Sequence, residues 1–573
     1  MAAFLRFHGL GFGLPAVFHP DEPVLVHEAL KLGVHRLNTD YVNHPHLFIY
    51  LLYFLYGAVF LLGKTVGIFS SLGKFQELFF SDPTLFYLLG RGIVALTGVG
   101  TVWVLYLLGR RSYGRRVGLC AALFLSVAFL HVRESHYIKL GILETFWVTL
   151  GSFFLIDMIQ SRRLRSYLLA GLAAGAALST NYNCILFWPA IAVAHWIRTH
   201  SEKTSFWLDR KLWLSYGAAV FGFAATSPVL LLKFGAFVSK DFYLFQTIGR
   251  GQETAVEEGM VPWVFYLTRT LRFGLGIPLL ALSILGVGYA VTRRRREDLC
   301  LLFFPTLYLG ACLLMIGVSV HRYILPIVPV VLLWAARLWE EGLTRFRQTP
   351  KRRLGYAFGL ACFLSVPLAS SLYHNYLISS GLDTRLQAKR WVESRLPTGT
   401  KIAIERFVAV PAFGPPLKET AEENKAKLEM IRQRHPEKGR YRSGELEILV
   451  RHPPTYVIID LGGGTFGGTY ENDYHLNDLI REGVRYVIVN DLFTRPFLNS
   501  KRRNERVLEF RRMLERHAEV ACVFDPFRLG ANRFFLDHDA VVTPFDHLFR
   551  LRYPGPRLTV YELRPNPLIE ASR

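Results

Sequence analysis

Long apolar runs, separated by short polar stretches, dominate the chain between residues 85 and 372. A helix needs a run of about 17–25 apolar residues to cross a bilayer. The pattern predicts about 10 to 11 such spans and therefore a polytopic α-helical membrane protein. We place the spans near 85–109, 117–132, 140–159, 166–180, 184–198, 212–233, 272–292, 299–318, 323–339 and 354–372.

Basic residues between these runs predict the orientation of the chain. Arg and Lys are enriched in short cytoplasmic loops of membrane proteins. All of the basic clusters can be cytoplasmic together, because they alternate with loops poorer in Arg and Lys. The clusters lie at 110–116, 162–165, 203–211, 293–296 and 345–353.

The same assignment places the other loops on the outer face. These are residues 133–139, the loop 234–271, the pair His321–Arg322 and everything after 373. If the first loop is also outside, an even number of spans must separate it from residue 134. We therefore expect the apolar run 46–69 to lie along the interface rather than to cross.

The first residues form an interrupted apolar run. Met1–Val17 is too short to span a bilayer, and Arg6, Gly11 and Pro15 break it. It lacks the charged region and the cleavage site of a signal peptide. We expect it to be the outer end of a spanning helix whose start is missing, as a start codon assigned too late would produce.

The pattern changes after residue 373, where short β-rich runs alternate with helical segments. Such alternation is typical of a soluble α/β domain. We therefore predict a transmembrane domain over 1–372, with a first external loop at 18–84, and an extracytoplasmic α/β domain over 373–573. The expected strands are 401–405, 456–460, 485–490, 520–524 and 557–563, and the expected helix is 504–518.

Composition agrees with a membrane protein. Of the 573 residues, 51% are hydrophobic, and the mean hydropathy is +0.25. The formal net charge of +22 sits largely in the clusters between spans, which favours contact with anionic lipid headgroups over nucleic-acid binding. The six cysteines show neither metal-ligand nor disulfide spacing.

Two adjacent carboxylates, Asp21 and Glu22, follow the interrupted first run. Adjacent carboxylates at a membrane surface are costly unless they are solvated or used. One could take a proton from an acceptor hydroxyl, and the other could orient it or hold a cation. The alternative is a helix start, with Asp21 as the cap before Pro23.

Basic residues on the outer face are contrary to the enrichment of Arg and Lys in cytoplasmic loops. They are therefore candidates for binding a phosphate. Arg133, Glu134 and Lys139 lie in one short outer loop. Arg322, preceded by His321, offers a planar fork of donors suited to a phosphate. Charged residues beside spans also simply extend to the headgroup level, and this alternative stays open.

Histidines mark two of these outer segments. His44 and His46 open the run 46–69 and could bind a metal or a phosphate, or only begin a helix at the headgroup level. His136 lies within the 133–139 loop. A separate glycine-rich stretch, 459–465, resembles a nucleotide loop, but a surface loop explains it better.

The motifs together resemble the GT-C glycosyltransferases, specifically the family of protein O-mannosyltransferases and aminoarabinose transferases. The resemblance rests on His-Pro-Asp-Glu at 19–22, His-Pro-His-Leu at 44–47, Arg-Glu-Ser-His-Tyr at 133–137, Ser-Thr-Asn-Tyr-Asn at 179–183, Arg-Tyr-Ile-Leu-Pro at 322–326, and Asp383 through Pro397. The sequence departs from the family at His46, Glu134 and Asn181, where the family often has Pro, Asp and Lys.

The resemblance implies roles for these residues. Asp21 would be the catalytic base with Glu22 beside it, Glu134 would belong to the second acidic motif, and Arg322 would contact the donor phosphate. The family uses a polyprenyl-phosphate sugar and inverts the anomeric centre. Arg133, Lys139 and His321 are expected to help at the phosphate, and His44, His46 and His136 to contact substrate or a metal.

The sequence therefore predicts an inverting glycosyltransferase of the plasma (inner) membrane that acts on its non-cytoplasmic side. Its expected partners are the lipid-linked donor, membrane lipids and a protein, glycolipid or envelope-polymer acceptor. No cofactor is required, although a divalent cation is compatible with the site. A flippase for a lipid-linked sugar is the alternative. The ionisable residues of a flippase would be expected deep within the spans, whereas those of this sequence collect at the outer ends. A scaffold with a degenerate site fits less well, because both acidic motifs are present.

Overall fold

The computed structural model describes the whole chain except certain segments, which are 35–40, 42, 230–234, 236–260, 315–319, 343–349, 407–410, 421, 423–424, 426–453, 462–474, 492–500, 529–541, 546–547 and 565–573. The chain separates into two compact units. The helical unit is Met1–Leu10, Asp21–Gly57 and Leu88–Asn375. The second unit is Gly11–Pro20, Ala58–Tyr87 and Tyr376–Arg573, so it includes two segments that precede residue 88.

Helices account for most of the first 379 residues. They begin and end close to the predicted apolar runs, because the hydrogen bonds of a helix satisfy its backbone in an apolar surrounding. Their bounds are α1 (Ala2–Phe7), α2 (Glu22–Val34), α3 (Leu47–Thr65), α4 (Leu72–Ser81), α5 (Thr84–Tyr113), α6 (Arg115–Val127), α7 (Phe129–Glu134), α8 (Leu140–Ser161), α9 (Leu164–Leu178), η1 (Tyr182–Phe187), α10 (Trp188–Glu202), α11 (Arg210–Thr226), α14 (Pro262–Phe265), η2 (Tyr266–Leu271), α15 (Arg272–Leu275), α16 (Ile277–Arg293), α17 (Arg296–Leu314), η3 (His321–Ile327), α18 (Val328–Gly342) and α19 (Pro350–Ser379).

Several helices are long and apolar enough to cross a membrane. In the described part of the chain there are five, or six if a bent pair counts as one span. The chain is therefore a polytopic helical membrane protein, as predicted. The five are Leu47–Thr65, Thr84–Tyr113, Leu140–Ser161, His321–Gly342 and Leu354–Arg395. The first of these is the run that we expect to lie along the interface, and that expectation stays a prediction, as does crossing by the shorter helices.

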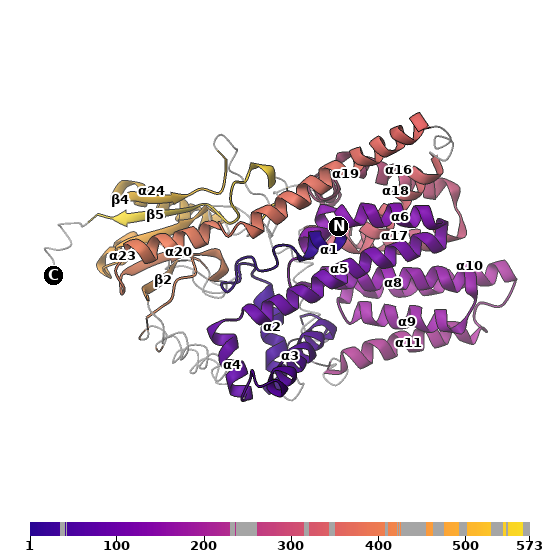
Figure 1. Ribbon diagram of the computed structural model, residues 1–573, viewed down its shortest axis with the longest axis horizontal. Coiled ribbons are helices and arrows are strands. Elements are labelled where there is room, and N and C mark those ends of the chain that lie inside the picture. The colour runs from indigo at the N-terminus through magenta and orange to yellow at the C-terminus, as the bar shows by residue number, and fades with distance from the viewer. Residues whose placement is uncertain are drawn as a thin grey trace. The chain divides into compact units, whose positions relative to one another are not determined.

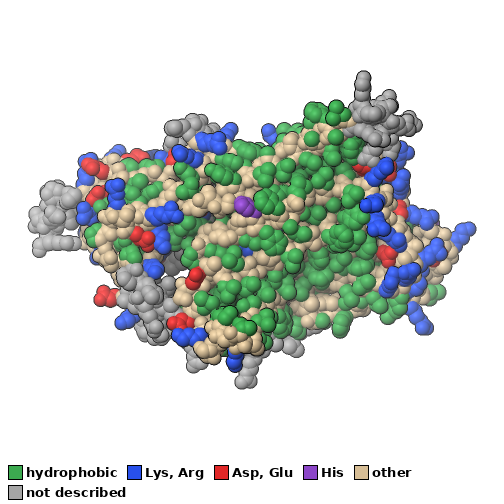
Figure 2. Space-filling view, viewed as in Figure 1, with side chains coloured by type: hydrophobic (Ala, Val, Ile, Leu, Met, Phe, Trp, Pro, Cys, Tyr) green, Lys and Arg blue, Asp and Glu red, His purple; other side chains and the backbone are tan. Residues whose placement is uncertain are grey.

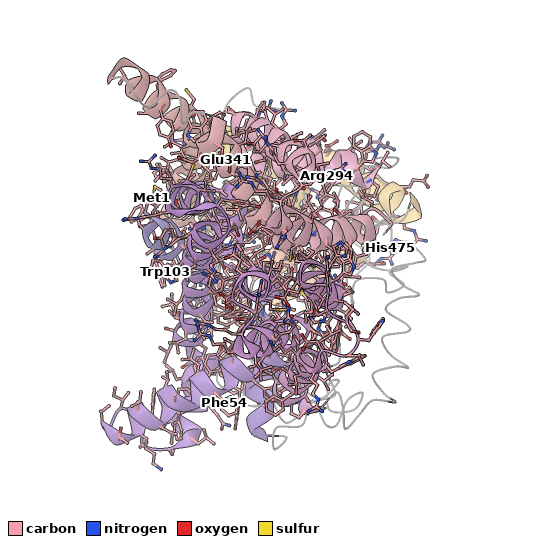
Figure 3. All side chains as sticks on the ribbon, turned by 90° about the vertical axis from the view of Figure 1, so that its right-hand side faces the viewer. Met1, Phe54, Trp103, Arg294, Glu341 and His475 are labelled. Carbon is pink, nitrogen blue, oxygen red and sulfur yellow. The ribbon has the colours of Figure 1, made fainter. Side chains whose placement is uncertain are left out.

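Apolar side chains cover the outside of the helices (Figure 2). Phe54 on α3 and Trp103 on α5, both labelled in Figure 3, are 61% and 62% exposed. Large apolar side chains are unfavourable in water, so an extended surface of this kind indicates contact with lipid.

Helices α9 and α11 run side by side (Figure 1) and approach closely at two glycines. A Cβ atom added to Gly171 would lie 2.1 Å from the carbonyl oxygen of Ser215, and one added to Gly175 would lie 2.3 Å from that of Ala219. Gly171 and Gly175 form the Gly-x-x-x-Gly spacing through which membrane helices pack backbone against backbone.

The bent pair, Pro262–Leu275 and Ile277–Arg293, turns by 118° at Gly276. Gly276 has a φ of +75°, which side chains rarely adopt, and a Cβ there would lie 2.8 Å from Val366 of α19. The bend therefore needs glycine both for its backbone conformation and for the approach of α19.

The basic clusters at 110–116, 162–165, 203–211 and 293–296 share one end of the helical unit, because contacts at that end connect the segments that carry them. Arg111 of α5 binds Asp157 near the end of α8 at 2.8 Å, and Gln160 binds Glu297 of α17 at 2.9 Å. Lys211 donates to the carbonyl of Arg162 at 3.1 Å. Lys and Arg gather at this end in Figure 2, and Figure 3 looks onto it. A common end is what the positive-inside rule requires, and the sidedness of the chain stays a prediction.

The second unit contains a five-stranded sheet in the order β2-β1-β3-β5-β4. Strands β1, β2 and β3 are parallel, and β5 is antiparallel to both of its neighbours. The predicted strands and helix of this part are confirmed, which gives the expected α/β architecture. The bounds are β1 (Lys401–Glu405), β2 (Val457–Leu461), β3 (Tyr486–Asn490), β4 (Ala518–Phe524), β5 (Leu558–Leu563), α20 (Thr384–Arg395), α23 (Leu476–Arg481) and α24 (Lys501–His517).

Helices cover both faces of this sheet. Val392 of α20 packs against one face with Ile402 and Ile404, and Phe510 of α24 packs against the other with Val487. Alternate residues of a strand point to opposite faces, so each strand supplies both cores. The glycine-rich stretch after β2 and most of the predicted outer loop 234–271 lie outside the described residues.

Candidate functional site

Asp21 and Arg322 meet at the end of the helical unit opposite the basic clusters. Asp21 directly precedes α2, and Arg322 lies in η3, the short 3-10 helix that leads into α18. The Nη2 atom of Arg322 is 3.5 Å from Oδ2 of Asp21, and the two side chains are 25% and 45% exposed. The predicted base and the predicted phosphate contact are therefore neighbours, although about 300 residues separate them in sequence.

Glu22 occupies a very different environment from Asp21. It forms a buried ion pair with Arg91 of α5, with Nε–Oε1 at 2.8 Å and Nη2–Oε2 at 2.7 Å. Its Oε1 also accepts a bond from the backbone N–H of Ile138 at 3.1 Å, and Arg91 donates to the carbonyl of Leu10 at 2.6 Å. This geometry favours a positioning role: Glu22 fixes the start of α2 and, with it, the neighbouring Asp21.

Arg91→Ala is expected to lower the free energy of unfolding by about 3–5 kcal/mol, because it leaves the buried carboxylate of Glu22 without its cation. Thermal unfolding of the purified protein measures this loss. The matched control is Arg162→Ala, since Arg162 is 63% exposed and its pair with Glu202 lies at the surface. Equal losses in the two variants would contradict a special role for the Glu22–Arg91 pair.

Glu134 lies between two cations in a buried cluster. Arg133 donates to its Oε1 at 2.7 Å, and the Nζ atom of Lys139 is 3.6 Å from its Oε2. Arg133 and Lys139 also lie 5.7 Å and 5.2 Å from the centre of the Tyr137 ring. The three charged side chains carry a net charge of +1, which favours an anion nearby. Their ion pairing gives Glu134 a structural role beside the catalytic one expected from sequence.

His44 and His46 lie in the segment that precedes α3. His46 is buried, and its Nε2 is 2.7 Å from the carbonyl oxygen of Tyr41. Its backbone N–H donates to the hydroxyl of Ser227 at 3.1 Å, whereas the side chain of His44 is exposed. This geometry makes His46 an anchor of the first loop and leaves His44 as the accessible imidazole.

His321 is held beside Arg322. Its Nδ1 is 2.8 Å from the hydroxyl of Thr270, and its ring stacks on Phe265 with the centroids 4.8 Å apart. These contacts fix the start of η3. His321 therefore supports the placement of Arg322.

His136 is buried between two backbone carbonyls. Its Nδ1 is 2.9 Å from the oxygen of Val132, and its Nε2 is 3.1 Å from that of His8. Burial lowers the pKa of His136 to about 4, and nearby arginines act in the same direction. The imidazole is therefore neutral near pH 7, and only one of its two nitrogens can then donate to the carbonyl oxygen that it faces.

Lowering the pH from about 6.5 to about 4 is expected to destabilise the protein through His136. The unfolded state binds a proton at the ordinary pKa of about 6.5, whereas the folded state resists protonation until about 4, so the native state loses up to about 3 kcal/mol across this window. Thermal unfolding of wild type and His136→Gln at several pH values measures it. The variant should lose less stability on acidification, and an identical pH dependence would contradict this account.

Glu144 is a site residue that the sequence analysis did not single out. It lies near the start of α8, is 2% exposed, and its Oε2 accepts a bond from Nδ2 of Asn181 at 2.6 Å. Asn181 belongs to the Ser-Thr-Asn-Tyr-Asn motif and precedes η1. A carboxylate inside an apolar run is itself a signal, since charges are costly at bilayer depth.

Metal-binding side chains do not gather in the described residues. No three His, Cys, Asp or Glu side chains there come together in a group that could hold a metal ion. Asp21 contacts the cation of Arg322, and Nε2 of His46 faces a carbonyl oxygen. The divalent cation therefore stays a prediction.

The helices around Glu134 and Glu144 carry a family signature. Residues 88–232 match the model of the family described as dolichyl-phosphate-mannose-protein mannosyltransferase. This stretch of the chain is similar to that family. It runs from α5 to the end of α11 and includes Arg133, Lys139 and Asn181. The resemblance to the protein O-mannosyltransferase branch of the GT-C glycosyltransferases is thereby confirmed for this segment.

Similar solved structures share low sequence identity with the chain. ArnT from Cupriavidus metallidurans in the apo state is 13% identical, with a TM-score of 0.47 over 97% of this chain and 95% of that one. ArnT bound to undecaprenyl phosphate is 15% identical, with a TM-score of 0.44 over 78% and 74%. The Archaeoglobus fulgidus oligosaccharyltransferase tethered with an acceptor peptide is 13% identical, with a TM-score of 0.43 over 85% and 68%. The search of curated proteins finds no match.

Proposed function

We propose that the protein is an inverting glycosyltransferase. It moves a sugar from a polyprenyl-phosphate donor to an acceptor hydroxyl. The single observation that carries this proposal is the Asp21–Arg322 pair, which joins a proton acceptor and a phosphate-binding cation at a partly exposed position. The matched family, named for a dolichyl-phosphate donor, supports the choice of donor.

The reaction is a direct displacement. Asp21 takes the proton of the acceptor hydroxyl, and the hydroxyl oxygen attacks the anomeric carbon from the face opposite the phosphate. The new carbon–oxygen bond forms while the bond from the anomeric carbon to the phosphate oxygen breaks. The electron pair of that bond leaves with the polyprenyl phosphate, whose growing charge Arg322 stabilises.

The buried charged cluster at 133–139 contributes to donor binding through its electrostatic potential. Arg133 and Lys139 are both paired with Glu134, so they are not free to wrap the phosphate directly. The net positive charge of the cluster acts over a short range in an environment of low dielectric constant. We expect it to favour the phosphate electrostatically and Arg322 to make the contact.

The proposed side of action follows from charge and not from the family. The basic clusters among the described residues share the end of the helical unit opposite Asp21 and Arg322, and the positive-inside rule makes that end cytoplasmic. The site then faces the non-cytoplasmic side of the plasma (inner) membrane, and the second unit is extracytoplasmic. A protein, a glycolipid or an envelope polymer supplies the acceptor hydroxyl.

Proteoliposomes containing the purified protein test this proposal against transport. A polyprenyl-phosphate donor with a labelled sugar is added together with candidate acceptors, and the label is followed chemically. The proposal predicts that label leaves the lipid and that polyprenyl phosphate accumulates in equal amount. Label that crosses the bilayer while still attached to its original lipid would instead establish a flippase.

A further inference from the structure

The strongest feature left without a role is the carboxylate of Glu144. It is 2% exposed and lies inside the apolar run of α8. The hydrogen bond from Asn181 fixes its Oε2, and Asn181 is itself fixed by a backbone bond to the carbonyl of Ala177 at 3.0 Å. An ionisable side chain buried within an apolar helix of a membrane protein usually has a function and a partner.

Arg322 lies against the same face of α8. A Cβ atom added to Gly141 would be 3.9 Å from Cβ of Arg322 and 3.0 Å from Cδ1 of Leu325. Gly141 and Glu144 are three residues apart, so they share one helix face. Arg322 is therefore paired with Asp21 at 3.5 Å and lies beside the face of α8 that carries Glu144.

The proposed reaction requires Asp21 and Arg322 to separate. The base lies about 2.6–3.2 Å from the acceptor oxygen, and that oxygen lies about 3–3.5 Å from the anomeric carbon. The phosphate is on the far side of that carbon, so Asp21 and Arg322 must be more than about 6 Å apart during transfer. The 3.5 Å between Arg322 and Asp21 is too short for this arrangement.

We propose that Glu144 is the positioning residue for Arg322 when the donor phosphate displaces Asp21. This inference rests on the proposed function. The incoming phosphate takes the place of Asp21 at the guanidinium, and Glu144, held by Asn181, keeps the guanidinium oriented from the α8 side. Asp21 is thereby released to act as base only after the donor is bound.

The test measures binding of undecaprenyl phosphate to the full-length protein in detergent. Glu144→Gln keeps the shape of the side chain and an oxygen for Asn181, but removes the charge. We expect it to weaken binding about 10-fold. The matched control, Thr149→Val on the same helix, is expected to bind as wild type, because the buried Thr149 hydroxyl donates to the backbone carbonyl of Thr145 in its own helix.

A double variant separates positioning from folding. If Glu144 acts through Arg322, adding Glu144→Gln to Arg322→Gln should weaken binding further by less than about 2-fold. If the two losses multiply instead, or if Glu144→Gln alone binds as wild type, the inference is overturned while the proposed function stands. If wild type and Arg322→Gln bind equally, or if wild type does not bind, the donor site itself is wrong and the proposed function fails with it.

Discussion

Asp21→Asn is expected to lower the rate of sugar transfer by between about 10²- and 10⁴-fold, the usual contribution of a general base. The amide keeps the size of the side chain but cannot accept the proton of the acceptor hydroxyl. Binding of polyprenyl phosphate should be kept or become tighter, because the competing carboxylate at 3.5 Å from Arg322 is gone. Release of polyprenyl phosphate measures the rate, and a titration of the lipid measures the affinity.

Glu28→Gln is the matched control for this substitution. Glu28 lies on α2, the helix that Asp21 directly precedes, and it also pairs with a cation, Lys31, at 2.6 Å. Ion pairs of this kind contribute little, so the control should retain nearly full activity. Full activity in Asp21→Asn would exclude Asp21 as the catalytic base. If the variant lost lipid binding together with activity, the charge of Asp21 would instead serve the donor site.

Arg322→Gln is expected to lower kcat/KM for the donor by about 10²- to 10³-fold, as removal of one group that stabilises developing charge does. Glutamine can donate a hydrogen bond but carries no charge and no second arm for the phosphate. Initial rates at varied donor concentration measure the effect. The loss should appear in kcat as well as in KM, because the phosphate charge grows towards the transition state.

Arg272→Gln controls for the general loss of an outer arginine. Arg272 stacks over Phe273 at 5.3 Å and lies in α15, away from η3 in sequence. Its replacement should leave the donor kinetics close to those of wild type. If Arg272→Gln and Arg322→Gln behave alike, the effect reflects surface charge rather than a specific phosphate contact.

The helices and strands could largely be predicted from sequence because their signals are local. An apolar run such as Leu140–Ser161 needs no knowledge of its neighbours, and the same holds for the alternating strand Lys401–Glu405. The shared location of Asp21 and Arg322 could also be predicted, since the positions of the basic clusters place both residues at one end of the spans.

The partners of individual charges could not be predicted. Glu22 and Asp21 are adjacent and equivalent in sequence, yet the structure pairs Glu22 with Arg91 and leaves Asp21 beside Arg322. The choice depends on the rotation of α5 about its axis, which its apolar pattern does not define. A role for Glu144 could not be predicted for a related reason. Its partner Asn181 lies at another helix boundary and carries no charge, so the sequence does not link the two residues.

The configuration of the transferred sugar tests the central claim most directly. A single displacement, with Asp21 on the acceptor side and Arg322 on the phosphate side, inverts the anomeric carbon. Nuclear magnetic resonance of the product made from a donor of known configuration gives the answer. The account predicts complete inversion, and a product that retains the donor configuration would contradict it.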